Sequence, residues 1–403
     1  MATLDQPLQH IRGKYYLKHN PFPPATTGID IRRELWIPSS WNSELTHLIE
    51  LLKGGTGPKA FPIIGRYGSG KTYLMRWLEQ FFLNEGILPY FFDNPGLQFY
   101  DLANMLMRKV GRYEFSKGLW ELSKTYLYSG QPRLIELTFE EWLQSISSKQ
   151  QRDKALGTLR QVFETNLELT EDEEIAYRLA LLVTQTVVKP YFDYRDFVAG
   201  GKESLVAERQ EPPYFRTLVR ALLRVNNVSG IAFLIDEFEE VSSERRISKR
   251  KGHEYLATLH RLINLSEKEP LWLITAMTEE GATATEKLDP ALWERYTSEG
   301  QYKFELKPLQ TEDGKSLLVW WLDRARIDDS KKCTLFPFPD EIVSMLEQRL
   351  VLYPRRLVRF GFFVLQEAAQ NQEEAPIRKE FVQQVMDKLF PEAKGGSSGN
   401  RPE

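Results

Sequence analysis

Apolar residues gather in short continuous runs, separated by longer stretches with helical spacing. A run of about four to eight apolar residues bounded by turn residues is typical of a strand covered on both faces. Such runs occur at the start of 60–82 and at 87–93, 231–240, 271–278 and 302–309. Because these strands alternate with predicted helices, the pattern indicates an α/β fold whose mostly parallel sheet is sandwiched by helices.

Helical spacing predicts helices at roughly 41–53, 97–110 and 253–265, and it dominates two longer regions. Residues 111–213 have helical, aromatic-rich segments and no strand pattern, which predicts a large all-α insertion. The tail from 310 onward is also helical. The predicted domains are an extended N-terminal arm at 1–40, an α/β core at 41–110 and 214–309, the insertion at 111–213, a small helical lid at 310–391 and a disordered tail at 392–403.

Composition narrows the class of protein. Hydrophobic residues make up 42% of the 403 residues, which is enough for a sizeable core and excludes a disordered or fibrous chain. Cys333 is the one cysteine, so a disulfide framework and a cysteine zinc cluster are excluded. No run of apolar residues is long enough for a membrane helix, and the first 20 residues lack a signal-peptide core. We therefore expect a cytoplasmic protein.

The segment from Gly65 to Thr72 has the sequence GRYGSGKT, which matches the phosphate-binding pattern GxxxxGK[ST]. Phosphate oxygens need several backbone N–H groups that converge on one point, and glycines allow the chain to turn that tightly. The helix that follows directs its positive end at the anion. We expect Lys71 to reach the β- and γ-phosphates of ATP and Thr72 to ligate Mg²⁺. The predicted nucleotide-binding residues of the loop are Gly65, Gly68, Ser69, Gly70, Lys71 and Thr72.

The apolar run IAFLI ends in two carboxylates, Asp236 and Glu237. A strand beside a phosphate loop must deliver a carboxylate to the metal side of the nucleotide, so we expect Asp236 to hold Mg²⁺ through water. Glu237 would polarise the water that attacks the γ-phosphate. The alternative is a strand that runs into an ordinary acidic loop. The pair favours hydrolysis over storage of the nucleotide.

Further catalytic candidates follow the strand at 271–278. Thr275 and Thr278 lie near its C-terminal end, where they could orient the attacking water or simply satisfy a turn. Arg295 could project toward a neighbouring subunit's nucleotide and neutralise charge on the transferred phosphoryl group. Its alternative role is a surface ion pair. Arg355 and Arg356 lie in the first turn of a predicted helix, where the dipole disfavours cations, so an anionic partner such as the γ-phosphate is indicated for one of them.

Five segments in this order resemble the AAA+ ATPases: GRYGSGKT, IAFLIDEFEE, LITAMT, LDPALWERY and YPRRLVRF. The resemblance is greatest to the branch of origin-recognition and replication-initiator ATPases, with related transposition regulators and bacterial defence ATPases. It implies that a nucleotide lies between the α/β core and the lid, and that Arg355 or Arg356 reaches back from the lid. It also implies a homo-oligomer in which Arg295 of one subunit completes the site of another. ATP and ADP would then switch assembly on and off.

A basic run follows the acidic strand. Arg245, Arg246, Lys249, Arg250 and Lys251 place five cations within seven positions. Several such loops, lined up by oligomerisation, would neutralise phosphates of duplex DNA without reading its sequence. The alternative is a solvated loop, because the net charge of the chain is −3.

Two classes of function therefore compete. The first is an ATP-hydrolysing switch that acts on DNA-associated machinery, in transposition, replication or defence. The second is a signalling or scaffold ATPase whose helical insertion binds a protein partner without DNA. A small-molecule kinase is a weaker third, because the pair Asp236–Glu237 and the lid arginines fit hydrolysis better. A winged-helix domain normally follows the lid in the initiators, whereas one helix at 373–390 fits here.

Overall fold

The computed structural model describes residues 6–24, 36–54, 59–96, 99–128, 136–187, 191–199, 205–238, 249–298 and 302–391. The chain divides into two compact units, each described by itself. The first comprises Met1–Gly57, Gly65–Trp77 and Glu305–Glu403, and the second comprises Pro58–Ile64 and Leu78–Phe304. The helical insertion thus shares a unit with most of the sheet, and the N-terminal segment shares one with the lid.

The second unit is built on a five-stranded sheet in the order β2-β3-β4-β1-β5. β2, β3, β4 and β1 run parallel, and β1 and β3 are buried along their whole length, which is typical of a parallel sheet covered on both faces. The expected α/β class with a parallel sheet is therefore confirmed. The strands are β1 (Ala60–Ile64), β2 (Ile87–Phe92), β3 (Gly230–Ile235), β4 (Leu271–Met277) and β5 (Phe304–Glu305).

β5 is shorter than the strand predicted at 302–309. The N–H of Leu309 donates to the carbonyl of Leu352, 2.8 Å away, so this end of the segment joins the lid instead of the sheet. Apolar residues such as Leu306 are buried without being in a strand. The apolar run at 302–309 therefore correctly predicted that its phenylalanine and leucines are buried. It was wrong about the strand, which covers only Phe304–Glu305.

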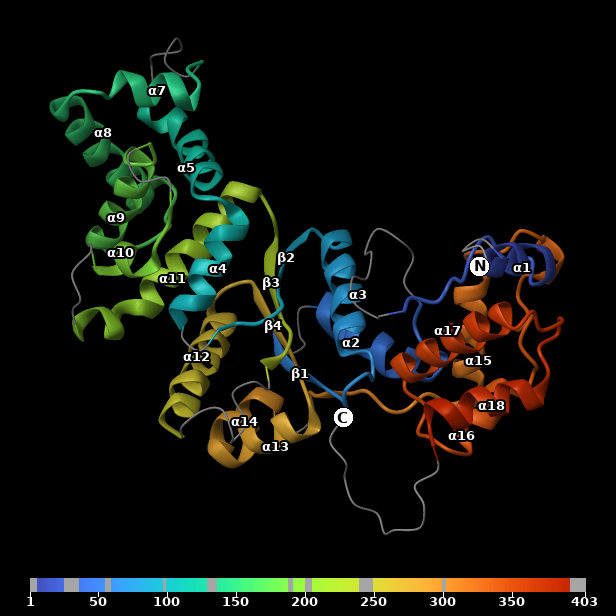
Figure 1. Ribbon diagram of the computed structural model, residues 1–403. Coiled ribbons are helices and arrows are strands. Elements are labelled where there is room, and N and C mark those ends of the chain that lie inside the picture. The colour runs from blue at the N-terminus through green and yellow to red at the C-terminus, as the bar shows by residue number, and fades with distance from the viewer. Residues whose placement is uncertain are drawn as a thin grey trace. The chain divides into compact units, whose positions relative to one another are not determined.

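Helices cover both faces of the sheet (Figure 1). α4 (Phe99–Val110), α11 (Leu205–Asn226) and α12 (Lys249–Lys268) lie on one side of it. On the other side is the C-terminal half of α3 (Lys71–Asn84), where the ring of Phe82 lies 6.0 Å from that of Trp272 in β4. α13 (Glu279–Leu288) and α14 (Pro290–Thr297) complete the unit.

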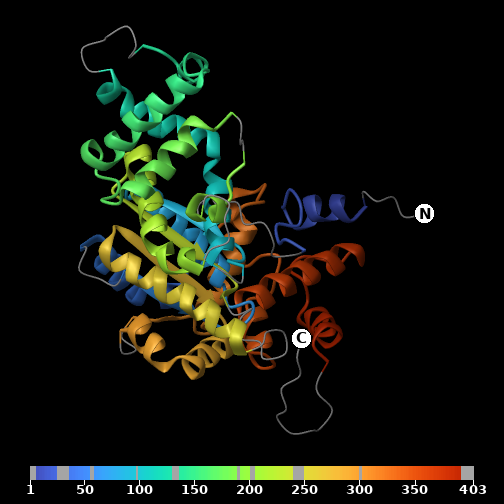
Figure 2. The same cartoon turned by 90° about the vertical axis from the view of Figure 1, so that its left-hand side faces the viewer.

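The described part of 111–213 is helical, as predicted, and continues from α4 and α11 beyond the end of the sheet in both views (Figures 1 and 2). Local caps define several helix starts: Thr138 with Glu141 and Ser148 with Gln151 form reciprocal capping boxes. The helices are α5 (Arg112–Leu127), α7 (Phe139–Ser145), α8 (Lys149–Gln161), the π-helical η2 (Val162–Asn166), α9 (Glu173–Thr184) and α10 (Tyr194–Ala199).

The insertion and the sheet share one hydrophobic core. A series of aromatic rings joins them: the centroid of Tyr194 lies 5.8 Å from that of Phe99, Phe99 lies 4.8 Å from Phe215, and Phe215 lies 6.1 Å from Phe233 in β3. All four side chains are buried. The insertion is therefore continuous with the core of the unit.

The first unit has a second hydrophobic core, formed by lid helices and the N-terminal segment. Residues 6–14 are helical, so the prediction of an extended arm is wrong for this part, although the segment does lie on a domain. The hydroxyl of Tyr15 donates to the carbonyl of Glu373 at 2.9 Å. The elements are α1 (Gln6–Lys14), η1 (Ser39–Trp41), α2 (Asn42–Gly54), α15 (Thr311–Asp323), η4 (Asp329–Lys331), α16 (Ile342–Glu347), α17 (Pro354–Gln370) and α18 (Lys379–Leu389).

Candidate nucleotide site

The predicted phosphate loop occupies residues 65–70, between the end of β1 and the start of α3. Gly68 and Gly70 have φ angles of +79° and +106°, a region that side chains with a Cβ rarely adopt. A Cβ at Gly65 would lie 2.5 Å from the Oγ of Ser69 and 2.9 Å from the Cβ of Leu306. The three glycines are therefore needed for the tight turn that places backbone N–H groups around an anion.

Two side chains of this loop suit an anionic ligand. The buried Lys71 donates from Nζ to the carbonyl of Gly65 at 2.8 Å, so its ammonium lies folded onto the loop. Ser69 is fully buried, and its Oγ has no hydrogen-bond partner among the described residues. A buried hydroxyl without a partner is costly unless a ligand or water supplies one. Thr72, an exposed residue in the first turn of α3, follows directly.

Within the same unit, Arg355 contacts the phosphate loop. Its backbone N–H donates to the carbonyl of Gly68 at 3.3 Å, and its guanidinium carbon lies 4.5 Å from the ring centroid of Tyr67. A Cβ at Gly68 would meet the Cβ of Arg355 at 3.1 Å. Arg356, by contrast, lies over the ring of Tyr353, 5.8 Å from its centroid. Of the two candidate arginines, Arg355 is the one that these contacts place beside the loop.

Trp41 also flanks the loop, although no motif in the sequence marks it. A Cβ at Gly70 would lie 3.5 Å from Trp41 Cη2 and 3.8 Å from Pro354 Cγ. The carboxylate of Asp313 holds the turn that carries Trp41, because it accepts from Ser39 N at 2.8 Å and Ser39 Oγ at 2.6 Å. Burial opposes ionisation of Asp313, but hydrogen bonds from Ser39 and Ser40 outweigh it and lower the pKa of the carboxyl.

In the second unit, Asp236 follows β3 directly and is buried, with its N–H bonded to the carbonyl of Phe92 at 2.8 Å. Glu237 is exposed and has a φ of +52°, an uncommon conformation for a residue with a side chain. Its N–H donates to Oδ1 of Asp236 at 3.0 Å. Backbone strain of this kind is often kept at functional positions.

The pairing of the parallel strands shows at which edge of the sheet the chain leaves β1 and β3. β4 pairs with β1 on one side, where Met277 is opposite Ile64, and with β3 on the other, where Thr275 is opposite Ile235. The C-terminal ends of β1 and β3 therefore lie at the same edge. The phosphate loop follows β1 in the chain and Asp236 follows β3. In open α/β sheets, ligands bind at this edge.

Both candidate threonines have structural hydrogen bonds. The fully buried Thr275 Oγ1 lies 2.9 Å from the hydroxyl of Tyr296. Burial raises the pKa of Tyr296, although this hydrogen bond opposes the shift. Thr278 is the N-cap of α13 and accepts from the N–H of Gly281 at 3.1 Å. These contacts account for both hydroxyls without a water-orienting role.

Arg295 lies on α14 and is held by two side chains of α12. Its Nη2 lies 2.6 Å from Oε1 of Glu267, and its Nη1 lies 3.0 Å from Nε2 of His260. The guanidinium is partly exposed, and so is its carboxylate partner. The surface ion pair, which was the alternative role of Arg295, is present in this chain. Because exposed pairs are weak, the arginine can leave it at little cost.

The five nucleic-acid candidates are only partly described by the structure. Arg245 and Arg246 lie outside the described residues, and Lys249, Arg250 and Lys251 are described only as the first residues of α12. Among the described residues, no group of three or more histidine, cysteine or acidic side chains could form a metal centre. The described helices are also too short or too polar to cross a membrane.

Comparisons with known proteins show likeness in structure alone. No family model matches the chain, and no curated protein matches its sequence. Among solved structures, the chain is similar to the ORC2 protein of Aeropyrum pernix, solved as ADPNP–ADP complexes, with 13% identity and a TM-score of 0.42. The match covers 92% of this chain and 73% of that one.

Proposed function

We propose that this chain binds and hydrolyses ATP and acts as a nucleotide-dependent AAA+ switch. The observation that carries the proposal is the phosphate loop: Gly68 and Gly70 have positive φ angles, and the buried Ser69 Oγ lacks a protein partner. Asp236 supports it, because it directly follows β3, whose C-terminus lies at the same sheet edge as that of β1. A glycine cradle that follows β1 in the chain and a carboxylate that follows β3 are the groups that a triphosphate and its metal require.

Each residue has a defined task in this proposal. Lys71 exchanges the carbonyl of Gly65 for phosphate oxygens, and the loop N–H groups bind the remaining ones. Thr72 and Asp236 would hold Mg²⁺, which neutralises phosphate charge when bound. Glu237 would position and polarise the attacking water, because its exposed side chain follows the metal-side carboxylate directly. Arg355, at the loop, would sense the γ-phosphate.

Assembly would complete the site. In the proposed homo-oligomer, Arg295 leaves Glu267 and reaches the nucleotide of a neighbouring subunit, where it stabilises charge that develops on the transferred group. The exposure of both partners supports this exchange. Binding of ATP would thus favour assembly, and hydrolysis would reverse it.

The test of this function measures ATP affinity and phosphate release separately. We expect Lys71→Ala to weaken ATP binding by at least ~100-fold, because a charged hydrogen-bond donor to two phosphates is lost. Glu237→Gln should keep ATP binding and lower turnover by ~10²–10⁴-fold. The matched control is Lys287→Ala, which removes an exposed lysine of α13. Unchanged ATP affinity in Lys71→Ala would refute the assignment of the phosphate loop.

The proposed DNA-associated role rests on the basic run at 245–251 and needs its own test. We expect ATP-dependent, sequence-independent binding of duplex DNA that weakens steeply with salt. Replacing Arg245, Arg246 and Lys249 with alanine should reduce both the affinity and its salt dependence. If wild-type protein with ATP does not bind DNA at low salt, the signalling or scaffold ATPase becomes the better function.

A further inference from the structure

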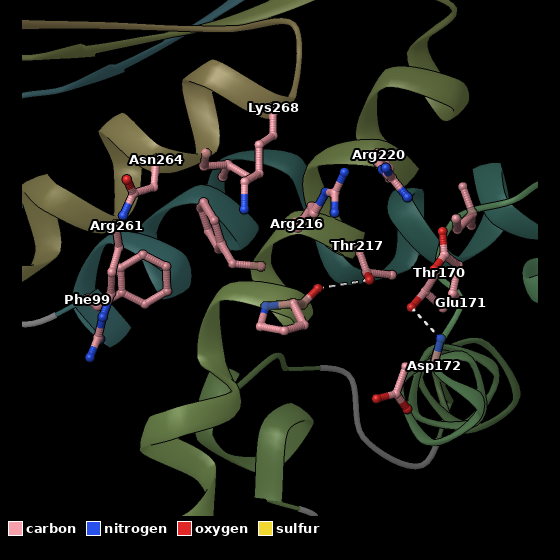
Figure 3. Close-up of a pocket in the computed structure, with 14 residues that line it drawn as sticks. Phe99, Thr170, Glu171, Asp172, Arg216, Thr217, Arg220, Arg261, Asn264 and Lys268 are labelled. Carbon is pink, nitrogen blue, oxygen red and sulfur yellow. Dashed lines mark hydrogen bonds between the residues drawn. The ribbon is translucent and has the colours of Figure 1, made fainter.

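A cavity of about 280 Å³ lies in the second unit, and none of the residues assigned to ATP lines it (Figure 3). Four segments form it: α11, the C-terminal half of α12, the loop at 169–172 that precedes α9, and the start of α4 at Phe99. Its wall has apolar side chains, including Phe99, Leu169 and Leu265, beside several cations. Cavities of this size accept a small ligand.

Two of the cations surround one buried carboxylate. Arg216 and Arg220, one helical turn apart on α11, both donate from Nε to Oε1 of Glu269, and the Arg220 bond measures 2.9 Å. The carboxylate is only 7% exposed, whereas the two arginines are 39% and 29% exposed. One negative charge therefore faces two positive charges. The terminal N–H groups of both guanidiniums have no acceptor among the described residues.

Two further donors line the same space. Lys268, near the end of α12, makes no hydrogen bond or ion pair with a described residue, and neither does the side-chain amide of Asn264 one turn earlier. Figure 3 shows Lys268 among the side chains that line the cavity together with Arg216 and Arg220. Arg261 extends elsewhere, with its guanidinium 5.9 Å from the ring centroid of Phe99. The surplus arginine and Lys268 together leave about two uncompensated positive charges.

Two acidic side chains on the loop that precedes α9 also line the cavity. Asp172 is committed to the start of α9, since its carboxylate accepts from the N–H groups of Glu174 and Ile175 at 2.9 and 3.2 Å. Glu171 is exposed at the rim. Its charge would repel an anion from that side, so the anionic group belongs at the wall formed by Arg216, Arg220 and Lys268.

We propose that this cavity binds a small phosphate monoester whose apolar part lies against Phe99, Leu169 and Leu265. Two surplus cations match the two negative charges of a phosphate monoester near neutral pH. Three side chains with several free donors exceed what the two oxygens of a carboxylate accept, whereas a phosphate offers three oxygens. The site is independent of the ATP site, because no residue is common to both.

Phenyl phosphate is a suitable probe, since it combines one phosphate with one ring. Calorimetry on the full chain should detect its binding in the wild type and, equally, in Lys71→Ala, where the phosphate loop is disabled. Phenol and inorganic phosphate should each bind more weakly than phenyl phosphate, because each offers only half of the contacts. Binding of phenyl phosphate that disappears in Lys71→Ala would place the probe at the phosphate loop and overturn the proposal.

Substitutions at the rim test the cavity without disturbing the buried carboxylate. Lys268→Glu should weaken phenyl phosphate binding at least about tenfold, because a charged donor is replaced by a repelling charge. Lys287→Glu, the same charge change on exposed α13, should leave it unchanged. Glu171→Gln should strengthen binding several-fold by removing a negative charge. Equal affinities in Lys268→Glu, Lys287→Glu and wild type would refute the site, as would absence of binding to the wild type.

Discussion

Arg355 and Arg295 occupy contrasting surroundings, although both are candidates to touch a nucleotide phosphate. Arg355 lies against the phosphate loop, with its N–H on the Gly68 carbonyl and its guanidinium over Tyr67. Arg295 is held by Glu267 and His260 on a partly exposed surface. The first arginine is already placed beside its proposed ligand, whereas the second must exchange partners. One is therefore expected to act within a subunit and the other only between subunits.

The largest effect that tests this comparison is expected from Arg295→Ala. An arginine supplied by a neighbour contributes ~10³–10⁵-fold to phosphoryl transfer, so hydrolysis should fall by about that much in the assembled protein. Dilute, unassembled protein should hydrolyse ATP at the wild-type rate. Phosphate release measured across protein concentrations separates the two states.

Glu267→Gln is the control for the role of Arg295. It removes the ion pair but keeps the arginine, so assembled protein should retain hydrolysis, and stability should change by no more than ~1 kcal/mol. A defect of Arg295→Ala in the unassembled protein would contradict action between subunits.

The second largest effect, on ATP affinity, is expected from Arg355→Ala. Loss of a charged donor at the γ-phosphate should weaken ATP affinity ~10–100-fold and change ADP affinity less. Arg356→Ala serves as the comparison, because Arg356 lies over Tyr353 and should matter less. Titration with both nucleotides distinguishes the variants. An effect confined to Arg356→Ala would reverse the assignment.

Substitution of Asp313 tests whether its carboxylate stabilises the turn at Ser39 that carries Trp41. Asp313→Asn should lower the free energy of unfolding by ~1–3 kcal/mol, because a carboxylate that accepts from Ser39 is lost. The folded state lowers the pKa of Asp313, so this stabilisation is complete above the unfolded pKa of ~3.9 and disappears as pH falls through the folded pKa. Denaturant unfolding at neutral and acidic pH measures the loss of stability in Asp313→Asn and the dependence of the wild-type stability on pH.

The neighbouring Glu312 provides the matched control for Asp313. Its side chain is 80% exposed and pairs with Lys315, so Glu312→Gln should change stability little. If the two variants lose equal stability, the turn at Ser39 is not held by the buried carboxylate.

The smallest effect is expected at Tyr67. Its ring is 69% exposed and faces the Arg355 guanidinium, an interaction that contributes ~0.5–1 kcal/mol at such a site. Tyr67→Ala should therefore weaken ATP affinity about two- to five-fold, and Tyr67→Phe should not. Equal losses in both variants would show that the hydroxyl, not the ring face, is what matters.

The sequence predicted the features that depend on neighbouring residues. The strand at 60–64, the glycine loop and Lys71 are consecutive, so their pattern is visible without a fold, and the same holds for Asp236 after its apolar run. The sequence could not distinguish Arg355 from Arg356, because the choice depends on which one meets Gly68, far away in the chain. The sequence also could not show which residues contact Arg295, Thr275 and Asp313, because those partners are distant in the chain. Likewise, the cavity beside Glu269 combines segments with no common motif.

The aromatic series from Tyr194 through Phe99 and Phe215 to Phe233 has a mechanical consequence. Protein interiors are close-packed and transmit strain, so displacement of one of these rings is expected to disturb its neighbours. A small residue in place of one ring is therefore expected to loosen the packing of both the insertion and β3, which share this core.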